Sequence, residues 1–289
     1  MKKSILLTID VEDWFQVENF KQWISFSSWG TREVRVEQNT HRILDLFDSF
    51  KEQQIHATFF VLGWIAQRFP DLVKEIDKRG HEVASHGYNH ILCSLESNEK
   101  LKNDLTDSKK LLEDITGSPI HGYRAPNFSI STETLKVIEE CGYLYDSSFN
   151  SFSMNKRYGS LDLCQNCKKG IVYQISNSFF EIPISNLSLR YLKTDLPWGG
   201  GGYFRLYPLS LFKKGIQSIL QNEEAYLFYM HPWEVDPEQP KVDEASFFYK
   251  FRHYMNLDKT EIRLKKLISD FRNQEFITCR EIIKNKTSL

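Results

Sequence analysis

The chain has 289 residues, enough for one large α/β domain or two small ones with a substantial buried core. Its 37 basic and 38 acidic side chains nearly cancel and form no long run of one sign, which argues against nucleic acid or an anionic membrane surface as the main partner. No stretch approaches the roughly 18 apolar residues of a membrane-spanning helix, and the apolar run after Met1 is too short for a signal peptide. We therefore expect a cytoplasmic protein without membrane insertion, and composition leaves its oligomeric state open.

Buried strands and amphipathic helices alternate about seven times along the chain, starting with an almost wholly apolar strand at Ile5–Asp10. Such alternation predicts a parallel sheet, and a closed barrel suits this length better than an open sheet. The fold class is therefore α/β, a single distorted (β/α) barrel of seven to eight units, with residues 1–289 as one domain. Further strands are expected at residues 57–62, 81–85, before 123, 143–146, 179–184, 225–230 and 276–277. Helices are expected around residues 43–50, 72–76, 101–115, 132–141, 211–220 and 257–268.

Two later stretches lack such a pattern. Residues 150–175 are polar and without clear period, which predicts a loop, and they contain Cys164 and Cys167. The five cysteines are odd in number and scattered, so free thiols are a better interpretation than a disulfide framework or a zinc site. The run Gly199–Gly202 allows close approach of the backbone to a ligand, but no Lys or Ser/Thr follows it as a phosphate loop would need.

The stretch 80–90 contains two histidines four residues apart, His86 and His90, directly after the third predicted strand. If the chain begins a helical turn there, both imidazoles project from one face, within reach of one ion. Neutral imidazole is the commonest ligand for zinc-like metals, and a catalytic site needs three protein ligands and an open position for water. The pair therefore requires a carboxylate from elsewhere. The alternative is that the two histidines merely flank and cap a turn.

The carboxylates come from the end of the first strand, and other strand ends also carry polar residues. In an α/β barrel the carboxyl ends of the strands meet at one rim. The residue types suit metal-assisted hydrolysis, in which an ion lowers the pKa of water and polarises a carbonyl while side chains move protons. The residues expected at this rim are Asp10, Glu12, Asp13, His86, His90, Arg124, Asp146 and His231.

Five motifs follow one another in order along the chain: Thr8–Phe15, Ser85–His90, Gly122–Pro126, Tyr145–Ser148 and Phe228–Glu234. Each motif alone is weak, whereas five in order are specific. On these motifs the chain resembles the polysaccharide deacetylases of carbohydrate esterase family 4, in the branch associated with exopolysaccharide gene clusters. The resemblance extends over roughly residues 4 to 280, and the segments 200–205 and 252–254 also fit it.

The resemblance implies a hydrolase that uses a divalent metal, most often Zn²⁺, to remove acetyl groups from N-acetylated glycans, that is, to cleave linear C–N bonds. Carried over by position, Asp10 matches the general base and Arg124 the residue that holds it. His86 and His90 match metal ligands, and His231 matches the general acid, with Asp146 as its partner.

The chain departs from the family at the first motif, because Val11 follows Asp10 where most members have a second Asp. The third metal ligand is then Glu12 or Asp13. Asp10 and Glu12 share a face of an extended strand, whereas Asp13 would need a turn, so we favour Glu12. Seven residues are predicted to bind substrate, although each aromatic one is by default a packing residue. They are Trp14, Tyr88, Pro126, Trp198, Gly201, Tyr203 and Trp233.

The altered first motif keeps two other functions open. One is hydrolysis of a non-sugar amide, as in allantoinase-like or cyclic-imide relatives. The other is a sugar-binding barrel that has lost turnover, which the intact set Asp10, His86, His90 and His231 disfavours.

Overall fold

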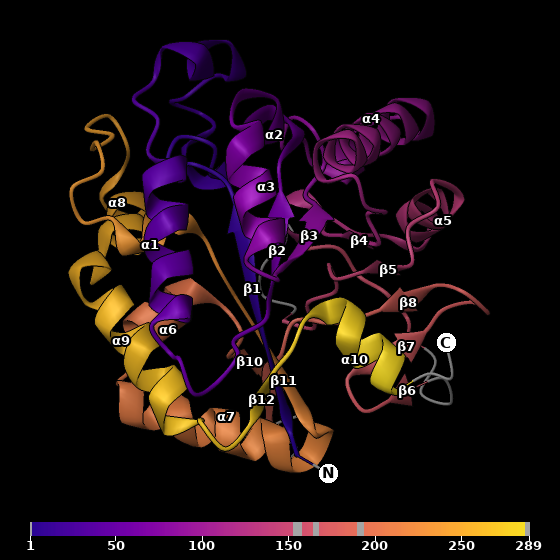
Figure 1. Ribbon diagram of the computed structural model, residues 1–289. Helices are drawn as coiled ribbons and strands as arrows, with labels where there is room; N and C mark the ends of the chain where they lie inside the picture. The colour runs from indigo at the N-terminus through magenta and orange to yellow at the C-terminus, as the bar shows by residue number, and fades with distance from the viewer. Residues whose placement is uncertain (1, 153–157, 164–167, 190–193, 287–289) are drawn as a thin grey trace.

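A curled, mostly parallel sheet forms the centre of the computed structural model, which describes residues 2–152, 158–163, 168–189 and 194–286 (Figure 1). Seven described strands run parallel and pair in the order β11, β1, β2, β3, β4, β5, β8. Helices cover the outside of this sheet, so the predicted α/β class and distorted (β/α) barrel are confirmed. The strands are β1 (Ser4–Val11), β2 (Ala57–Val61), β3 (Glu82–Ser85), β4 (Gly122–Tyr123), β5 (Tyr145–Asp146), β8 (Phe180–Glu181), β11 (Ala225–Met230) and β12 (Glu275–Phe276), which pairs with β1.

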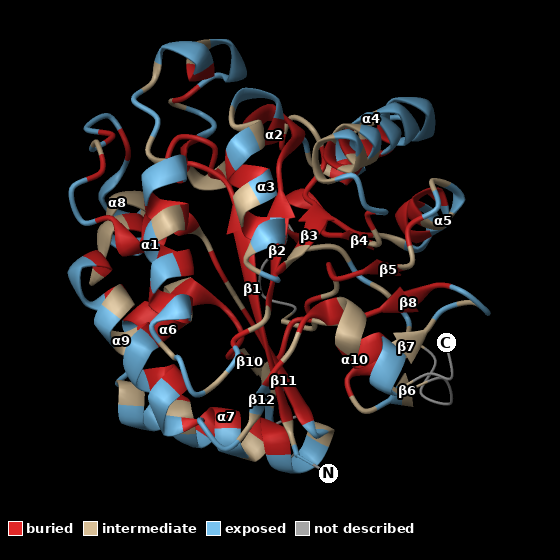
Figure 2. Cartoon of the chain, viewed as in Figure 1, coloured by how far each residue is buried: buried red, intermediate tan, exposed pale blue. Residues whose placement is uncertain are grey.

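The central strand β1 is buried along its whole length because helices cover one face of the sheet and the barrel interior fills the other. Each covering helix buries only one side. In α4 the leucines at 101, 105 and 112 are buried, and Figure 2 shows buried inner and exposed outer faces on α1, α4 and α9. The helices are α1 (Val36–Asp48), α2 (Gly63–Arg68), α3 (Pro70–Lys78), α4 (Asn98–Thr116), α5 (Thr132–Glu140), α6 (Gly201–Leu206), α7 (Leu209–Glu223), α8 (Phe247–Tyr254), α9 (Leu257–Asp270) and α10 (Cys279–Lys286).

The two ends of the parallel array approach each other without a regular ladder between β8 and β11. The Leu227 amide donates to Ser185 Oγ at 2.8 Å, and the Tyr229 amide donates to the Gly199 carbonyl at 2.7 Å. The segments after β8 and before α6 therefore cover the free edge of β11, which limits unpaired backbone groups there.

Several elements differ from the sequence-based expectation. The stretch expected as a loop contains β6 (Lys168–Lys169) and β7 (Val172–Gln174), which extend the sheet: β7 pairs antiparallel with β8, and β6 pairs antiparallel with β7. The hairpin β9 (Asn186–Leu189) and β10 (Thr194–Pro197) and the helices α6, α8 and α10 were not predicted. They are short, so contacts with the rest of the chain outweigh any local pattern. Cys164 and Cys167 lie outside the described residues.

Within the described part of the chain, every helix is too short or too polar to cross a lipid bilayer.

Candidate active site

Three side chains from the ends of two strands, which lie on either side of β2, form a compact cluster at the rim of the barrel. Glu12 follows β1, whereas His86 and His90 follow β3, and one ligand atom from each lies within 4.8 Å of the others. Within this cluster, His90 Nε2 lies 3.2 Å from Glu12 Oε2. All three residues are buried.

The expected helical turn between the histidines is absent, and a tight loop brings the rings together instead. Their centroids lie 5.4 Å apart. Gly87 (φ +75°) and His90 (φ +54°) both have left-handed backbone conformations, and a Cβ on Gly87 would meet Asp104 at 2.9 Å. The Asp104 carboxylate accepts the Tyr88 amide at 2.9 Å. A non-glycine residue rarely adopts positive φ, so the conformation of His90 is a special feature of this loop. The loop conformation, rather than helical spacing, therefore orients the second imidazole.

Protonation suits both imidazoles to metal binding. His86 Nδ1 lies 2.7 Å from the Arg124 carbonyl, which can only accept, so Nδ1 carries the hydrogen and Nε2 keeps its lone pair. Burial lowers the pKa of His86, and it lowers the pKa of His90 to about 4. Both rings are therefore neutral at pH 7.

The carboxylate fits the same group. Burial alone would raise the pKa of Glu12, but the neighbouring His90, His231 and His86 lower it to about 2, so the group is ionised. Its Oε2 is buried and accepts no hydrogen bond from the described residues. A buried, unsatisfied carboxylate oxygen facing two imidazoles fits a divalent cation with a two-nitrogen, one-oxygen ligand set, as in catalytic zinc sites.

The neighbouring carboxylate of Asp13 points elsewhere. Its Oδ1 accepts the Trp14 amide at 2.8 Å, and its Oδ2 accepts the amides of Arg35 and Val36 at 2.7 and 2.9 Å. It therefore ties the end of β1 to the start of α1. Asp13 lies outside the ligand cluster.

Asp10 lies at the end of β1 beside this cluster and is paired with a fully buried arginine. Arg124 Nη1 donates to Asp10 Oδ1 at 2.7 Å and to Thr8 Oγ1 at 2.8 Å. The other side of the guanidinium donates to the carbonyl and hydroxyl oxygens of Ser147, both at 2.9 Å. Contacts from two directions fix the arginine, and through it the carboxylate of Asp10.

Contrary to the expectation from the sequence, Asp146 does not contact His231. Its carboxylate accepts both the amide and the hydroxyl of Ser148, and the Ser148 hydroxyl in turn accepts the Ala125 amide at 2.8 Å. Burial raises the pKa of Asp146 and of its neighbour Glu181. Through Ser148, Asp146 therefore supports the segment that carries Arg124.

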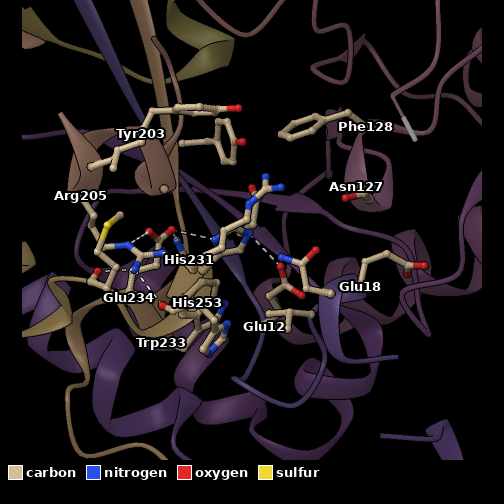
Figure 3. A pocket seen from close by; sticks show the side chains of 18 of the residues that line it. Glu12, Glu18, Asn127, Phe128, Tyr203, Arg205, His231, Trp233, Glu234 and His253 are labelled. Atoms are coloured by element: carbon tan, nitrogen blue, oxygen red, sulfur yellow. Dashed lines mark hydrogen bonds and ion pairs between the residues drawn. The ribbon is translucent and has the colours of Figure 1, made fainter. Parts of the chain in front are cut away.

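The partner of His231 is instead Glu234, three residues later. His231 Nδ1 lies 2.9 Å from Glu234 Oε1, and His231 Nε2 lies 2.9 Å from Glu12 Oε1 (Figure 3). The second oxygen of Glu234 accepts Arg205 Nε at 2.8 Å. Burial would lower the pKa of His231, but the charges and hydrogen bonds of Glu12 and Glu234 outweigh it and raise the pKa to about 10. The imidazole is thus protonated, and its Nε2 faces the cluster.

A cavity of about 290 Å³ connects these groups. Asp10, Glu12, His86, His90 and His231 line it, and Figure 3 shows Tyr203 and Phe128 on opposite sides. Of the seven residues predicted to bind substrate, Tyr203 and Trp233 line this cavity.

The other five lie elsewhere. Trp14 and Trp198 are buried, with their indole N–H groups bonded to the carbonyls of Glu33 and Phe212, so both are packing residues. A Cβ on Gly201 would meet the Glu234 carboxylate at 2.3 Å, which shows that this glycine makes room for protein, not ligand. Tyr88 lines a different surface depression, and Pro126 is buried at the start of the short helix at Pro126–Phe128.

Sequence reasoning missed Glu234 and Arg205. The spacing of His231 and Glu234 is that of a capping box, which the structure contains and which was a usable signal. No local pattern identifies Arg205, because its four acceptors are distant in sequence: Glu234 and the carbonyls of Arg252, His253 and Met255.

The fold and the rim residues define a (β/α)-barrel with a candidate divalent-cation site, a carboxylate suited to act as a base (Asp10) and a protonated histidine suited to act as an acid (His231). In comparison with known proteins, residues 2–145 match the polysaccharide deacetylases, so the chain resembles that family as the motifs predicted. Residues 147–284 match a domain of unknown function, DUF3473.

Individual relatives agree with this placement. The peptidoglycan-N-acetylglucosamine deacetylase of Bacillus cereus is 40% identical over 104 residues, which cover 36% of this chain and 47% of that protein. The chain thus spans about half the length of the curated relatives it matches. A Mycobacterium smegmatis structure assigned to the polysaccharide deacetylases has a TM-score of 0.61 at 19% identity, covering 99% of this chain and 90% of that one. The PuuE allantoinase structure has a TM-score of 0.60 at 16% identity, covering 97% and 87%. At these identities the structures show a shared fold.

Proposed function

We propose that this chain is a metal-dependent hydrolase that removes N-acetyl groups from amino-sugar residues of a polysaccharide or its precursor. The observation that carries the proposal is the meeting, in one cavity, of the cluster Glu12, His86 and His90 with Asp10 and His231. The name of the Bacillus cereus relative supports an N-acetylglucosamine polymer as the substrate class. The exopolysaccharide branch and the cytoplasmic location stay predictions.

Glu12, His86 and His90 would hold the cation, with Zn²⁺ the best match to their two nitrogens and one oxygen. When bound, such an ion polarises the amide carbonyl and makes water a stronger nucleophile at neutral pH. Asp13 is left out of the ligand set, because three backbone amides already occupy its two oxygens.

The protein's own residues move the protons. Asp10, held by Arg124, accepts a proton from the attacking water. His231 Nε2 gives its proton to the leaving nitrogen as the C–N bond breaks, so the products are acetate and a free amino sugar. Glu234 fixes the ring of His231 through Nδ1, and Arg205 fixes Glu234. Asp146 acts at one remove, through Ser148 and the chain beside Arg124.

We also propose that residues 1–289 act as one catalytic unit. The part that matches the deacetylase family contains Asp10 and the three cluster residues, whereas the part of unknown function contains His231, Glu234 and Arg205. Strands from both parts pair in one sheet, β5 with β8 and β1 with β11. Neither part alone contains the proposed acid, base and metal ligands.

The test is acetate release from N-acetylglucosamine oligomers by zinc-loaded protein, with chelated protein and the Asp10→Asn variant as controls. We expect acetate from the loaded wild type only. Turnover of small ureides without action on glycans would instead indicate a non-sugar amidohydrolase. Glycan binding without product, unchanged by chelator and by Asp10→Asn, would indicate a binding protein.

A further inference from the structure

One wall of the catalytic cavity continues outward into an exposed apolar surface. Leu206 of α6 and Phe248 and Phe251 of α8 line the cavity, and 48%, 66% and 50% of their respective surfaces are exposed. Phe247, 81% exposed, lies beside them, with its ring centroid 6.3 Å from that of Phe251. We call these four residues the α8 rim. Large apolar side chains exposed together around a cavity mark a binding surface more often than an incidental one.

The α8 rim is held in place by buried contacts on the inner side of the helix. His253 is 1% exposed, and its ring stacks on Trp233 at 4.1 Å, which in turn stacks on His231 at 5.1 Å. Arg205 donates to the carbonyls of His253 and Met255 at 2.8 and 2.7 Å. The rim is therefore fixed relative to the proposed acid, and in Figure 1 α8 lies at the end of the molecule where β1 ends.

The size of the cavity indicates what crosses the rim. A volume of about 290 Å³ is at the bottom of the roughly 300–1,000 Å³ range of small-molecule pockets. A polymer whose acetylated unit enters this cavity must therefore place its other units outside, along the walls. The polar side chains of Tyr203 and Arg252 line the same cavity as these apolar groups. Rings beside hydrogen-bonding groups match a sugar chain, which presents both apolar faces and hydroxyls, better than they match a purely apolar tail.

We propose that the α8 rim binds the sugar units that flank the unit losing its acetyl group, so that the protein selects glycan chains over single sugars. The proposal rests on the proposed function and extends it, because it assigns the substrate length to residues of the domain of unknown function. Binding at the rim adds affinity for long substrates and does not touch the reacting atoms.

The test compares the double variant Phe248→Ala/Phe251→Ala with the wild type on N-acetylglucosamine oligomers of increasing length. Phe26→Ala is the matched control, since Phe26 is 52% exposed but does not line the cavity. We expect the ratio of kcat/KM for the longest to the shortest oligomer turned over to fall about tenfold or more in the double variant. The same ratio should stay at the wild-type value in the control.

Other outcomes overturn the proposal. A length ratio equal to that of the wild type would show that the rim does not contact the chain, and an equal loss at every length would show a structural role. Sedimentation of the wild type, but not of the double variant, with phosphatidylglycerol vesicles at an unchanged length ratio would assign the rim to a membrane. A wild type inactive on every oligomer would defeat the proposed function instead. In that case calorimetric titration of the same oligomers into both proteins tests the rim by binding, and equal affinities would overturn it.

Discussion

Two adjacent acids, Glu12 and Asp13, directly follow β1, and replacing each with its amide should have different consequences. In Glu12→Gln the cluster loses its negative charge and its buried, unsatisfied oxygen. Changes to residues that only orient a ligand cost about 10–100-fold in metal affinity, so loss of a ligand should cost more than about 100-fold. We expect dialysed Glu12→Gln to contain almost no zinc, and Asp13→Asn to keep the wild-type stoichiometry.

The expected effect of Asp13→Asn is on stability. Whichever way the new amide turns, its NH₂ group faces at least one backbone N–H that Asp13 now accepts. A buried donor left without an acceptor costs about 1–3 kcal/mol. Removal of a buried charge offsets part of that cost, since burial raises the pKa of Asp13 to about 6. The net expectation is a decrease of about 1 kcal/mol in the free energy of unfolding.

Elemental analysis after dialysis gives the metal stoichiometry, and denaturant unfolding of the chelated proteins gives stability without a contribution from the ion. Circular dichroism of both variants controls for folding. Zinc lost from Asp13→Asn but kept by Glu12→Gln would refute the ligand assignment. Zinc kept by both would refute the cluster as the metal site.

Three further predictions concern proton transfer and pH. Asp10→Asn should reduce acetate release about 10²–10⁴-fold with zinc content unchanged, and loss of zinc together with activity would contradict a role as base. Glu234→Gln should lower kcat, measured under saturating substrate, about 10²–10⁴-fold and change KM far less. Asp146→Asn should lower kcat less, because of these two acids only Glu234 contacts His231. A larger loss of kcat in Asp146→Asn than in Glu234→Gln would support the pairing of Asp146 with His231 that the sequence predicted. Burial lowers the pKa of His81 to about 4, below its unfolded value of 6.5, so the neutral imidazole stabilises the fold above pH 6.5. This stabilisation is about 3 kcal/mol, at 1.36 kcal/mol per pKa unit, and it is lost as the pH falls from 6.5 to 4. His81→Asn keeps an acceptor for the Ala57 amide and should flatten this part of the stability curve; an unchanged curve would contradict the argument.

Much of the fold could be predicted because its main elements carry strong local patterns. The strand β1 is an almost wholly apolar run, α4 has its leucines on one face, and Gly117 at φ +69° ends that helix as expected. The elements missed have no such pattern. The helix α6 begins inside a glycine run, and α8 has three exposed phenylalanines and one buried histidine, so tertiary contacts stabilise both.

The site divides in the same way. The sequence places Asp10, Glu12, His86 and His231 after parallel strands, and the architecture then brings them to one rim. The two histidine rings lie close together, as their spacing predicts, but a loop with positive φ at His90 replaces the expected helical turn.

The sequence alone determined the order of strands and helices and the set of acids, histidines and arginine at the strand ends, because both are local features of the chain. Only the tertiary structure decided which acid joins the histidines, which acid supports His231, and that α8 extends the cavity. Two of the three amides that Asp13 accepts, those of Arg35 and Val36, lie more than twenty residues away, and the arginine that holds Glu234 comes from a separate helix. The role of each carboxylate depends on which distant groups donate hydrogen bonds to it, and no periodicity in the sequence predicts those donors.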